Sequence, residues 1–324
     1  MSTVAVTGVG AIIGYGLLRS FRASGRPLQL VGCDIYPDAV GQAWCDVFEQ
    51  APPTASDSYL DWLEALLRRH RVTLLVPGIE QDVQRFAAAR QRLEACGCRV
   101  ALNDAALIEL ASDKWAMHEA LARIDDAVRI PSRLDGSFDQ LSAEFGLPFI
   151  LKPRRSYASK GLVRVSGRES FEPHRRLLGE ALMAQPIVGS DEEEYTVGVF
   201  GDGAGGIAAS ITLRRRLAAD GSTAKAWVRQ EPSLAPTVAR LCASFRPLGP
   251  TNLQFRRAGR HWKLLEINPR VSSSSSIRTA FGYNEAAMLL DYYLEGRLPA
   301  QPLVGSGFAA RYIEDFVVHD RDHF

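Results

Sequence analysis

The sequence predicts an α/β N-terminal Rossmann-like domain followed by a separate α+β domain, and three observations support this prediction. Apolar or β-branched runs alternate with helical patterns from the N-terminus to about residue 100. Beyond Asn103 this alternation stops, and short strands follow one another with few helices between them. The length of 324 residues suits two or three domains of roughly 100–200 residues each.

The N-terminal elements form strand–helix repeats. Strands are expected over Val4–Thr7, Leu28–Cys33, Val72–Val76 and Cys98–Leu102, and helices over Ile12–Ala23, Tyr59–Arg69 and Gln81–Ala95. Strands that alternate with helices form a parallel sheet with right-handed crossovers. We therefore place a doubly wound domain at residues 1–108.

The rest of the chain is expected to contain two further units, at residues 109–186 and 187–324. The first has helices at Ala105–Leu110, Asp113–Arg123 (capped by Ser112) and Glu169–Glu180, and strands at Phe149–Lys152, Leu162–Val165 and Ala181–Gln185. The second has strands at Tyr195–Phe200, Gly206–Leu213, Ala224–Val228, Thr251–Phe255 and Trp262–Ile267, a helix at Leu234–Ser244 and a helical region ending near Glu295. The last two strands form a hairpin, so this part is α+β.

Composition and charge exclude several classes of protein. Lys and Arg number 38 and Asp and Glu 37, which leaves a net charge of +1, whereas nucleic-acid-binding proteins usually carry a basic surface. No apolar stretch approaches the roughly 18 residues that span a bilayer, and the first residues lack the basic segment of a signal peptide. Five cysteines do not suggest a disulfide framework. We therefore expect a cytoplasmic protein without nucleic-acid or membrane partners.

A glycine-rich turn lies between the first strand and the first helix. Gly8, Gly10 and Gly14 could let backbone N–H groups approach an anion at the helix N-terminus. Asp34 lies 20 residues beyond Gly14, where dinucleotide-binding enzymes place an acid that binds the ribose. The spacing G-x-G-x-x-x-G also occurs in α/β domains that bind no dinucleotide. A nicotinamide site, a contact to an anion or acceptor substrate, and a purely structural turn all remain open.

Phosphate-binding chemistry is indicated by two separated lysines and a polar loop. Lys114 lies at the start of a helix, and Lys152 ends a strand. The loop that follows contains Ser159, Lys160 and Gly161. Lysines act as point charges on phosphates, and such a loop can cover them with N–H groups and hydroxyls. This combination suits a triphosphate.

The expected C-terminal hairpin carries oxygen ligands. Glu266 and Asn268 are two residues apart in a strand and so point to the same side, and Gln254 on the paired strand can reach that side. Such a set suits Mg²⁺, which completes its coordination with water and phosphate oxygens. Only Glu266 is anionic, so metal binding should be weak until a nucleotide supplies further charge. Arg270 is placed to stabilise charge on a transferred phosphoryl group.

In this order and spacing the motifs resemble the ATP-grasp superfamily, in its carbamoyl-phosphate-synthetase-like and carboxylate–amine ligase branch. The motifs that carry the resemblance are Ser112-Asp113-Lys114, Pro148-Phe149-Ile150-Leu151-Lys152-Pro153-Arg154, Glu194-Tyr195-Thr196-Val197, Asn252-Leu253-Gln254-Phe255 and Leu265-Glu266-Ile267-Asn268-Pro269-Arg270. The resemblance runs over most of the chain. It implies a pre-ATP-grasp domain at residues 1–108, an ATP-grasp lid subdomain with the phosphate loop at 109–186, and a C-terminal ATP-grasp subdomain with the metal site at 187–324.

The resemblance also implies residue roles. The nucleotide would be bound by Lys114, Lys152, Ser159, Lys160 and Gly161 at its phosphates, Gln185 and Ile187 at adenine, and Glu194 at the ribose. The metal, Mg²⁺ with Mn²⁺ as an alternative, would be bound by Gln254, Glu266 and Asn268. Lys152 and Arg270 would be the catalytic residues. The loop Ser156-Tyr157-Ala158-Ser159-Lys160-Gly161 lacks two glycines that related proteins often carry, which predicts a stiffer lid.

The activity implied is an ATP- and Mg²⁺-dependent ligase that activates a small-molecule carboxylate as an acyl phosphate for an amine or another nucleophile, releasing ADP and phosphate. Homodimers are common among such enzymes, and the oligomeric state of this chain stays open. The alternatives are a nicotinamide-dependent oxidoreductase that uses the glycine turn, and a non-catalytic ATP-binding regulatory protein. Either Arg214 or Arg216 is expected to face the phosphates or an anionic substrate, and Ser272–Ser276 to line the acceptor side of the site.

Overall fold

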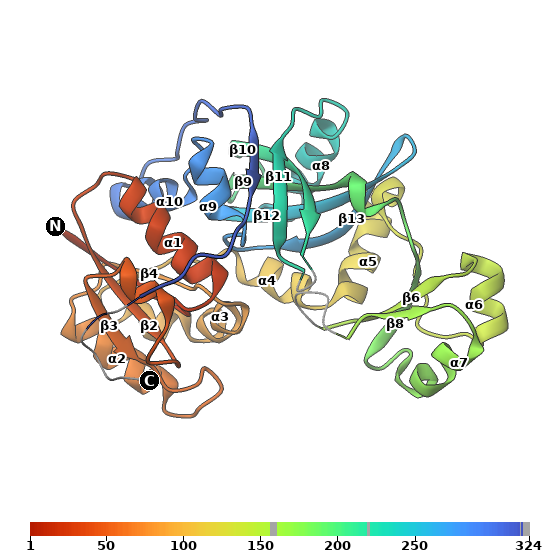
Figure 1. The fold of residues 1–324 in the computed structure, drawn as a ribbon, viewed down its shortest axis with the longest axis horizontal. Coiled ribbons are helices and arrows are strands. Elements are labelled where there is room, and N and C mark those ends of the chain that lie inside the picture. The colour runs from red at the N-terminus through yellow and green to blue at the C-terminus, as the bar shows by residue number, and fades with distance from the viewer. Residues whose placement is uncertain (156–160, 219–220, 318, 320–324) are drawn as a thin grey trace.

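The computed structural model describes residues 1–155, 161–218, 221–317 and 319. Within these residues the strands form three sheets, of five, six and three strands. Figure 1 shows the five-stranded sheet at the lower left, the six-stranded sheet at the top and the small sheet at the right. The α/β domain followed by an α+β part is therefore confirmed.

The first domain is built on a parallel sheet in the order β3-β2-β1-β4-β5. Its strands are β1 Ser2–Thr7, β2 Leu28–Asp34, β3 Val47–Gln50, β4 Leu74–Val76 and β5 Arg99–Val100. Its helices are α1 Ile12–Ala23, α2 Tyr59–Arg69 and α3 Glu80–Glu94. The short strand β3, half-exposed over most of its length, was not expected from the sequence.

The middle of the chain contains the small sheet, in the order β7-β6-β8. Its strands are β6 Phe149–Pro153, β7 Val163–Val165 and β8 Leu182–Pro186. The helices of this region are α4 Ala105–Ser112, α5 Lys114–Ile124, α6 Phe138–Phe145 and α7 Arg168–Phe171.

Two expectations for this region are wrong. The cap of α5 is Asp113, whose carboxylate accepts from the backbone N–H groups of Trp115 and Ala116, while Ser112 ends α4 and donates to a carbonyl of its own helix. The helix expected at Glu169–Glu180 is only the four-residue α7, followed by a 3₁₀ helix over Glu172–Leu177. Pro173 lies inside the expected helix, and its ring and missing N–H do not allow an α-helix to continue.

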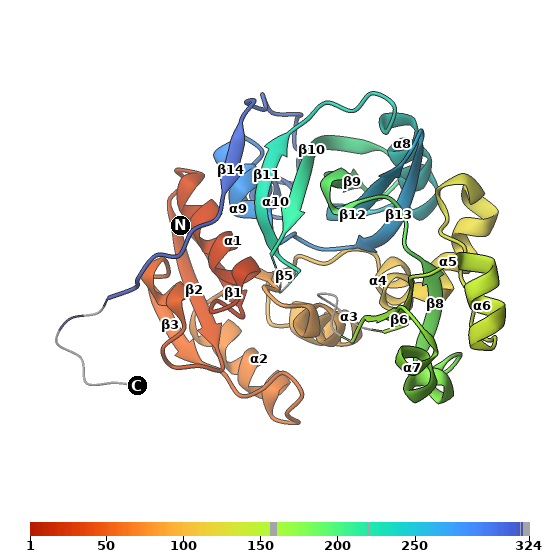
Figure 2. The same cartoon turned by 45° about the vertical axis from the view of Figure 1, so that its right-hand side comes forward.

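The six-stranded sheet is antiparallel, in the order β13-β12-β9-β10-β11-β14. Its strands are β9 Glu194–Asp202, β10 Ile207–Leu217, β11 Thr223–Val228, β12 Leu248–Ala258, β13 His261–Asn268 and β14 Phe308–Ala310. Its helices are α8 Ala235–Phe245, α9 Ser275–Ala280 and α10 Glu285–Glu295. The edge strand β14 was not expected, and the chain leads on from it toward the first domain (Figure 2).

The first domain and the six-stranded sheet share one hydrophobic core. Leu17 and Leu18 of α1 belong to the same buried cluster as Phe200 of β9, Ile211 of β10 and Leu289 of α10. The small sheet instead has a core of its own, with Phe149, Phe171 and Leu182 among its members. The first domain and the large sheet therefore form one packed body, to which the small sheet is attached through its strands.

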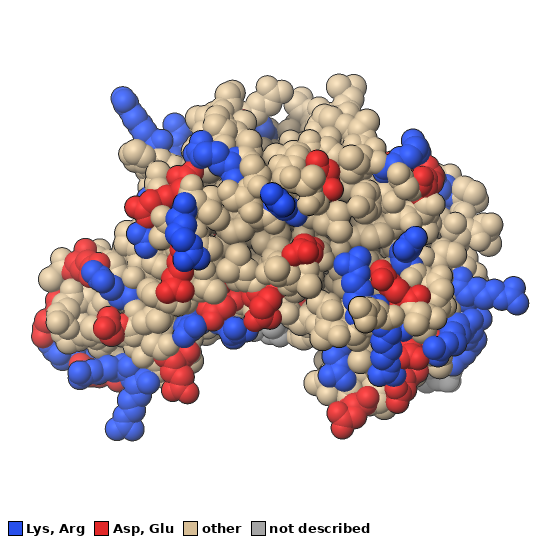
Figure 3. Space-filling model, turned by 180° about the vertical axis from the view of Figure 1, so that it is seen from behind, with Lys and Arg blue, Asp and Glu red and all other residues tan. Residues whose placement is uncertain are grey.

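Charged side chains are mixed in sign on the face seen from behind, where a notch separates the two lower lobes (Figure 3). No large surface of one sign appears on this face, in keeping with the net charge of +1. Among the described residues, no helix combines the length and apolar character needed to cross a membrane.

Candidate active site

A cavity of about 800 Å³ is lined by the small sheet, the six-stranded sheet and first-domain residues at the starts of α1 and α3. Predicted site residues that line it are Lys114, Lys152, Gln185, Ile187, Glu194, Gln254, Glu266 and Arg270. Asn268 joins this group through hydrogen bonds to two of its members. Gly161 does not line the cavity, and Ser159 and Lys160 lie outside the described residues.

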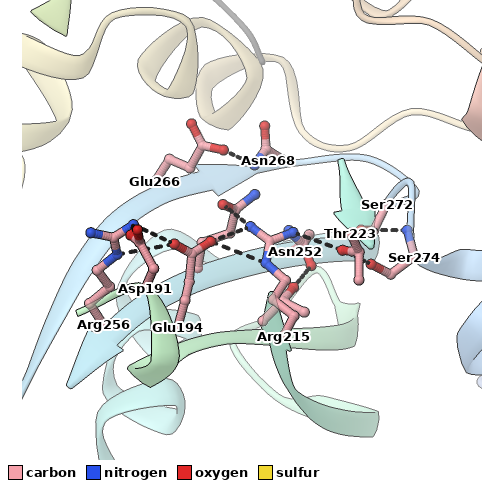
Figure 4. Close-up of polar contacts among 12 residues, drawn as sticks. Asp191, Glu194, Arg215, Thr223, Asn252, Arg256, Glu266, Asn268, Ser272 and Ser274 are labelled. Carbon is pink, nitrogen blue, oxygen red and sulfur yellow. Dashed lines mark hydrogen bonds and ion pairs between the residues drawn. The ribbon is translucent and has the colours of Figure 1, made fainter. Parts of the chain in front are cut away.

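The β12–β13 hairpin brings the predicted metal ligands together. Gln254 and Glu266 are register partners, and Asn268 Nδ2 donates to Glu266 Oε1 at 3.0 Å. Glu266 and Asn268 point from β13 to the same side (Figure 4). Among the described residues no cluster of three or more His, Cys, Asp or Glu side chains could hold a metal. One carboxylate with two amide oxygens nevertheless fits Mg²⁺, provided that phosphate oxygens complete the coordination.

Lys152, at the end of β6, extends into the cavity next to this hairpin. Its Nζ donates to the carbonyl oxygen of Leu265 at 3.2 Å. Burial lowers the pKa of Lys152 to about 8, although nearby Glu266 acts in the opposite direction. Burial alone would raise the pKa of Glu266, but Lys152, Asn268 and Lys114 outweigh this effect and lower it. The carboxylate is therefore ionised near neutral pH, and Lys152 loses its proton far more readily than an exposed lysine.

Lys114 is fixed at the start of α5 by contacts that also hold β6. Asp113 caps the helix and pairs with Arg154, just beyond β6, at 2.7 Å. The backbone N–H of Lys114 donates to the carbonyl oxygen of Arg154 at 3.0 Å. Burial lowers the pKa of Lys114, opposed by Glu266, Glu80 and Asp113. Both lysines are thus placed beside the single carboxylate of the hairpin.

Part of the cavity wall is apolar and includes Ile130, Ile150, Pro186, Ile187 and Val188. The side chain of Gln185 is turned away into a hydrogen bond with Ser132, from Nε2 to Oγ at 2.8 Å. A flat apolar ring system suits such walls, which fits the predicted adenine contact.

Glu194 lies between two arginines at the start of β9 (Figure 4). Its Oε1 accepts from Arg215 at 2.9 Å and its Oε2 from Arg256 at 2.9 Å, and its side chain is only 3% exposed. Arg215 also donates to Gln254 Oε1 at 2.5 Å. The predicted ribose-binding acid is therefore already paired, and one arginine links it to a predicted metal ligand.

The expectation that Arg214 or Arg216 faces the phosphates is wrong, because Arg215 is the one of these three neighbouring arginines that lines the cavity. Arg214 and Arg216 both pair with Glu192 at the surface. The reason is strand alternation: Ile211, Leu213 and Arg215 face the same side of β10. The buried apolar residues at every second position were the signal that could have identified Arg215.

Each of the three guanidinium nitrogens of Arg270 donates a hydrogen bond. Its Nε donates to Glu80 Oε2 at 2.6 Å, its Nη1 to the Val271 carbonyl oxygen at 3.1 Å and its Nη2 to Asn268 Oδ1 at 3.2 Å. Glu80 comes from the first turn of α3 and also lines the cavity. The sequence analysis did not find Glu80, because an acid in the first turn of a helix is ordinary.

The serine run only partly faces the cavity. Ser272 and Ser273 line it. Ser274 and Ser275 are buried, and Ser274 Oγ is 2.9 Å from Thr223 Oγ1. First-domain residues, among them Ile12, Ile79 and Gln81, line the same cavity.

The glycines of the N-terminal turn allow the start of α1 to pack closely against the end of β1 and against Gly78. A Cβ on Gly14 would lie 2.1 Å from the Gly8 carbonyl oxygen, and one on Gly78 would lie 2.8 Å from Gly14 Cα. Asp34, which would bind a ribose in a dinucleotide enzyme, accepts from the Gly10 N–H at 2.7 Å. The nicotinamide interpretation is therefore not favoured.

Comparisons with known proteins agree with this geometry. Residues 180–316 match the family model described as ATP-grasp in the biosynthetic pathway with Ter operon. A comparison with curated proteins finds no match to this chain.

Solved structures share the fold at low sequence identity. N5-carboxyaminoimidazole synthetase from Staphylococcus aureus, complexed with ADP, is 17% identical with a TM-score of 0.71, over 94% of this chain and 80% of that one. A biotin carboxylase–β,γ-ATP complex from Campylobacter jejuni is 15% identical with a TM-score of 0.73, and the match covers 94% of this chain and 73% of that one. A third similar structure is the biotin carboxylase domain dimer of the Hydrogenobacter thermophilus 2-oxoglutarate carboxylase, with MgADP and bicarbonate. It is 16% identical with a TM-score of 0.69, and the match covers 95% of this chain and 73% of that one.

Proposed function

Because the chain has the ATP-grasp fold and matches an ATP-grasp family over residues 180–316, we propose that it is an ATP- and Mg²⁺-dependent ligase. It joins a small-molecule carboxylate to an amine and releases ADP and phosphate. The observation that carries the proposal is the cavity of about 800 Å³ whose lining combines Lys114, Lys152, Glu266 and Arg270 with apolar side chains. The ADP, β,γ-ATP and MgADP complexes of the similar structures support a nucleotide in this position.

The lysines and Arg270 bind and orient the nucleotide. Lys114 and Lys152 neutralise phosphate oxygens, and the apolar walls around Ile187 receive the adenine. Glu266, Gln254 and Asn268 would hold Mg²⁺, which neutralises charge on the phosphates when it is bound. Arg270 lies where charge develops on the transferred phosphoryl group. The homodimer remains part of the proposal.

The reaction takes place in two steps. A carboxylate oxygen of the acid substrate forms a bond to the γ-phosphorus as the bond between that phosphorus and the β,γ-bridging oxygen breaks, giving an acyl phosphate and ADP. The amine nitrogen then attacks the acyl carbon, the carbon–oxygen bond to phosphate breaks, and the amine loses a proton. The protein supplies position and charge, so no side chain is needed as a covalent nucleophile.

The test is ADP formation from MgATP with pooled carboxylic acids and amines. We expect ADP release that depends on the substrates and is lost in Glu266→Ala. Glu119→Ala, which removes an exposed glutamate on α5, is the matched control and should retain activity. Binding of MgADP is measured in parallel. Failure of wild-type protein to bind MgADP would refute the nucleotide site, and substrate-dependent hydride transfer without ADP would favour the oxidoreductase.

A further inference from the structure

Glu80 is a carboxylate of the first domain that reaches the reaction centre. It pairs with Arg270 at 2.6 Å, and the two side chains are 24% and 16% exposed. It also lies close enough to Lys114 to raise that lysine's pKa against the effect of burial. No other acid is hydrogen-bonded to Arg270 among the described residues.

The loop immediately before Glu80, which begins α3, is closely packed. A Cβ on Gly78 would lie 2.1 Å from the Thr7 carbonyl oxygen, so only glycine fits between β1 and the start of α1. Ile79 in turn occupies the space above Gly8, where a Cβ would lie 2.5 Å from Ile79 Cγ2. The glycine turn therefore fixes the backbone immediately before Glu80.

The other partners of Arg270 are neutral. Asn268 Oδ1 and the Val271 carbonyl oxygen accept from its two terminal nitrogens. The Arg270 guanidinium is ionised in all three bonds, but only Glu80 adds a full opposite charge, and its 2.6 Å bond is shorter than the 3.1 and 3.2 Å bonds to the neutral acceptors. Glu80 is thus the strongest determinant of where the guanidinium points.

Resting on the ligase function proposed above, we propose that Glu80 is a positioning residue that holds the guanidinium of Arg270 in place for the charge of the transferred phosphoryl group. The first domain then contributes to phosphoryl transfer as well as to the acceptor side of the cavity. Loss of Glu80 leaves Arg270 attached only to neighbours in its own segment, Asn268 and Val271. A misplacement of about 1 Å can reduce a rate by about 100-fold.

The test compares the affinity for MgADP alone with the affinity for MgADP plus aluminium fluoride, a mimic of the transferred phosphoryl group. It needs no acceptor substrate. We expect Glu80→Ala to reduce the preference for the fluoride complex by about 10- to 100-fold with little change in MgADP binding. Glu80→Gln should lose less, because its amide oxygen still accepts from Arg270. Arg26→Gln is the matched control, since it breaks another ion pair between the first domain and the C-terminal helices, at Asp291, without touching the cavity.

A double-mutant comparison separates positioning from a general structural effect. Glu80→Ala should add little to the loss caused by Arg270→Lys, because both changes remove the same interaction. The proposal is overturned if the two losses add fully, if both Glu80 variants keep the wild-type preference, or if Arg26→Gln lowers the preference as much as Glu80→Ala. It is also overturned if wild-type protein binds MgADP but shows no preference for the fluoride complex, a result that leaves the proposed nucleotide site standing. Absence of MgADP binding would instead refute the proposed function and this role with it.

Discussion

The small sheet and the six-stranded sheet face the same cavity but are anchored differently. The small sheet packs on a core of its own, which includes Phe149 and Phe171. The six-stranded sheet shares its core with the first domain through residues such as Leu17 and Phe200. Because separate cores can open separately, we expect the part that carries Lys152 to open more independently of Glu266, Arg270 and Glu80 than these three residues do of one another.

The strongest test of this difference removes one buried phenyl ring from each core. Phe149→Ala and Phe200→Ala should each cost about 3–5 kcal/mol of local stability, because both rings are fully buried. Hydrogen exchange should increase only in residues 138–186 for the first variant. For the second it should increase in the first domain and the large sheet together. Loss of protection throughout the chain in Phe149→Ala would contradict the separation of the two cores.

Arg215→Ala tests the polar part of the fixed body. The variant removes the partner of Gln254 Oε1 and one of the two arginines that pair with the buried Glu194, so we expect a loss of about 3 kcal/mol in unfolding free energy and weaker MgADP binding. Denaturant unfolding and nucleotide titration measure the two effects. Arg216→Ala is the matched control: its partner Glu192 is half-exposed, and surface pairs contribute little. If Arg215→Ala and Arg216→Ala lower the unfolding free energy and the MgADP affinity equally, the buried Arg215 contributes no more than a surface arginine.

The pH dependence of MgADP binding tests the lysine contributed by the small sheet. Lys152 carries its charge below its pKa of about 8 and loses it above, so affinity should be level at lower pH and fall by up to about tenfold per pH unit above 8. Because its pKa is lowered, Glu266 stays ionised at neutral and higher pH. Glu266 therefore does not contribute to the change of MgADP affinity with pH. Lys152→Arg should make the profile flat. A decline of the same slope in Lys152→Arg would assign the effect to another group.

The smallest effect is expected from Arg26→Gln. Arg26 joins the first domain to α10 by pairing with Asp291 and with Glu295 at 2.7 Å. These pairs are partly exposed, and a shared apolar core holds the same interface, so the melting temperature should fall by less than about 2 °C. A large fall would mean that ion pairs rather than the core join the two regions.

The fold could be predicted from the sequence where periodicity was strong. The alternation of strands and helices in the first domain is set by local apolar patterns, which tertiary contacts do not reverse. No residue of the edge strands β3 and β14 is buried, so neither contains the buried apolar run that marks most of the other strands. Helix α6 did carry a signal that was not used, a capping box formed by Ser137 and Gln140.

The candidate site was predictable where its residues lie near one another in sequence. Glu266 and Asn268 share a strand face by simple alternation, and Arg215 could have been assigned by the same rule. Glu80 could not be found in this way, because it meets Arg270 across 190 residues. Such a pair depends on how the first domain packs on the large sheet, and no local pattern encodes it.

The way in which the first domain is joined to the rest also limits how this protein could be re-engineered. Asn103, in the segment after β5, donates to Thr251 Oγ1 at 2.7 Å and accepts from the Leu248 N–H at 2.8 Å. These two hydrogen bonds anchor the segment that follows the first domain to β12. Exchanging the first domain for that of a relative would cut through these bonds and through the shared core. A change of acceptor substrate is therefore better sought in the short loops at the strand ends, where Ile12, Ile79 and Gln81 meet the cavity, than by swapping modules.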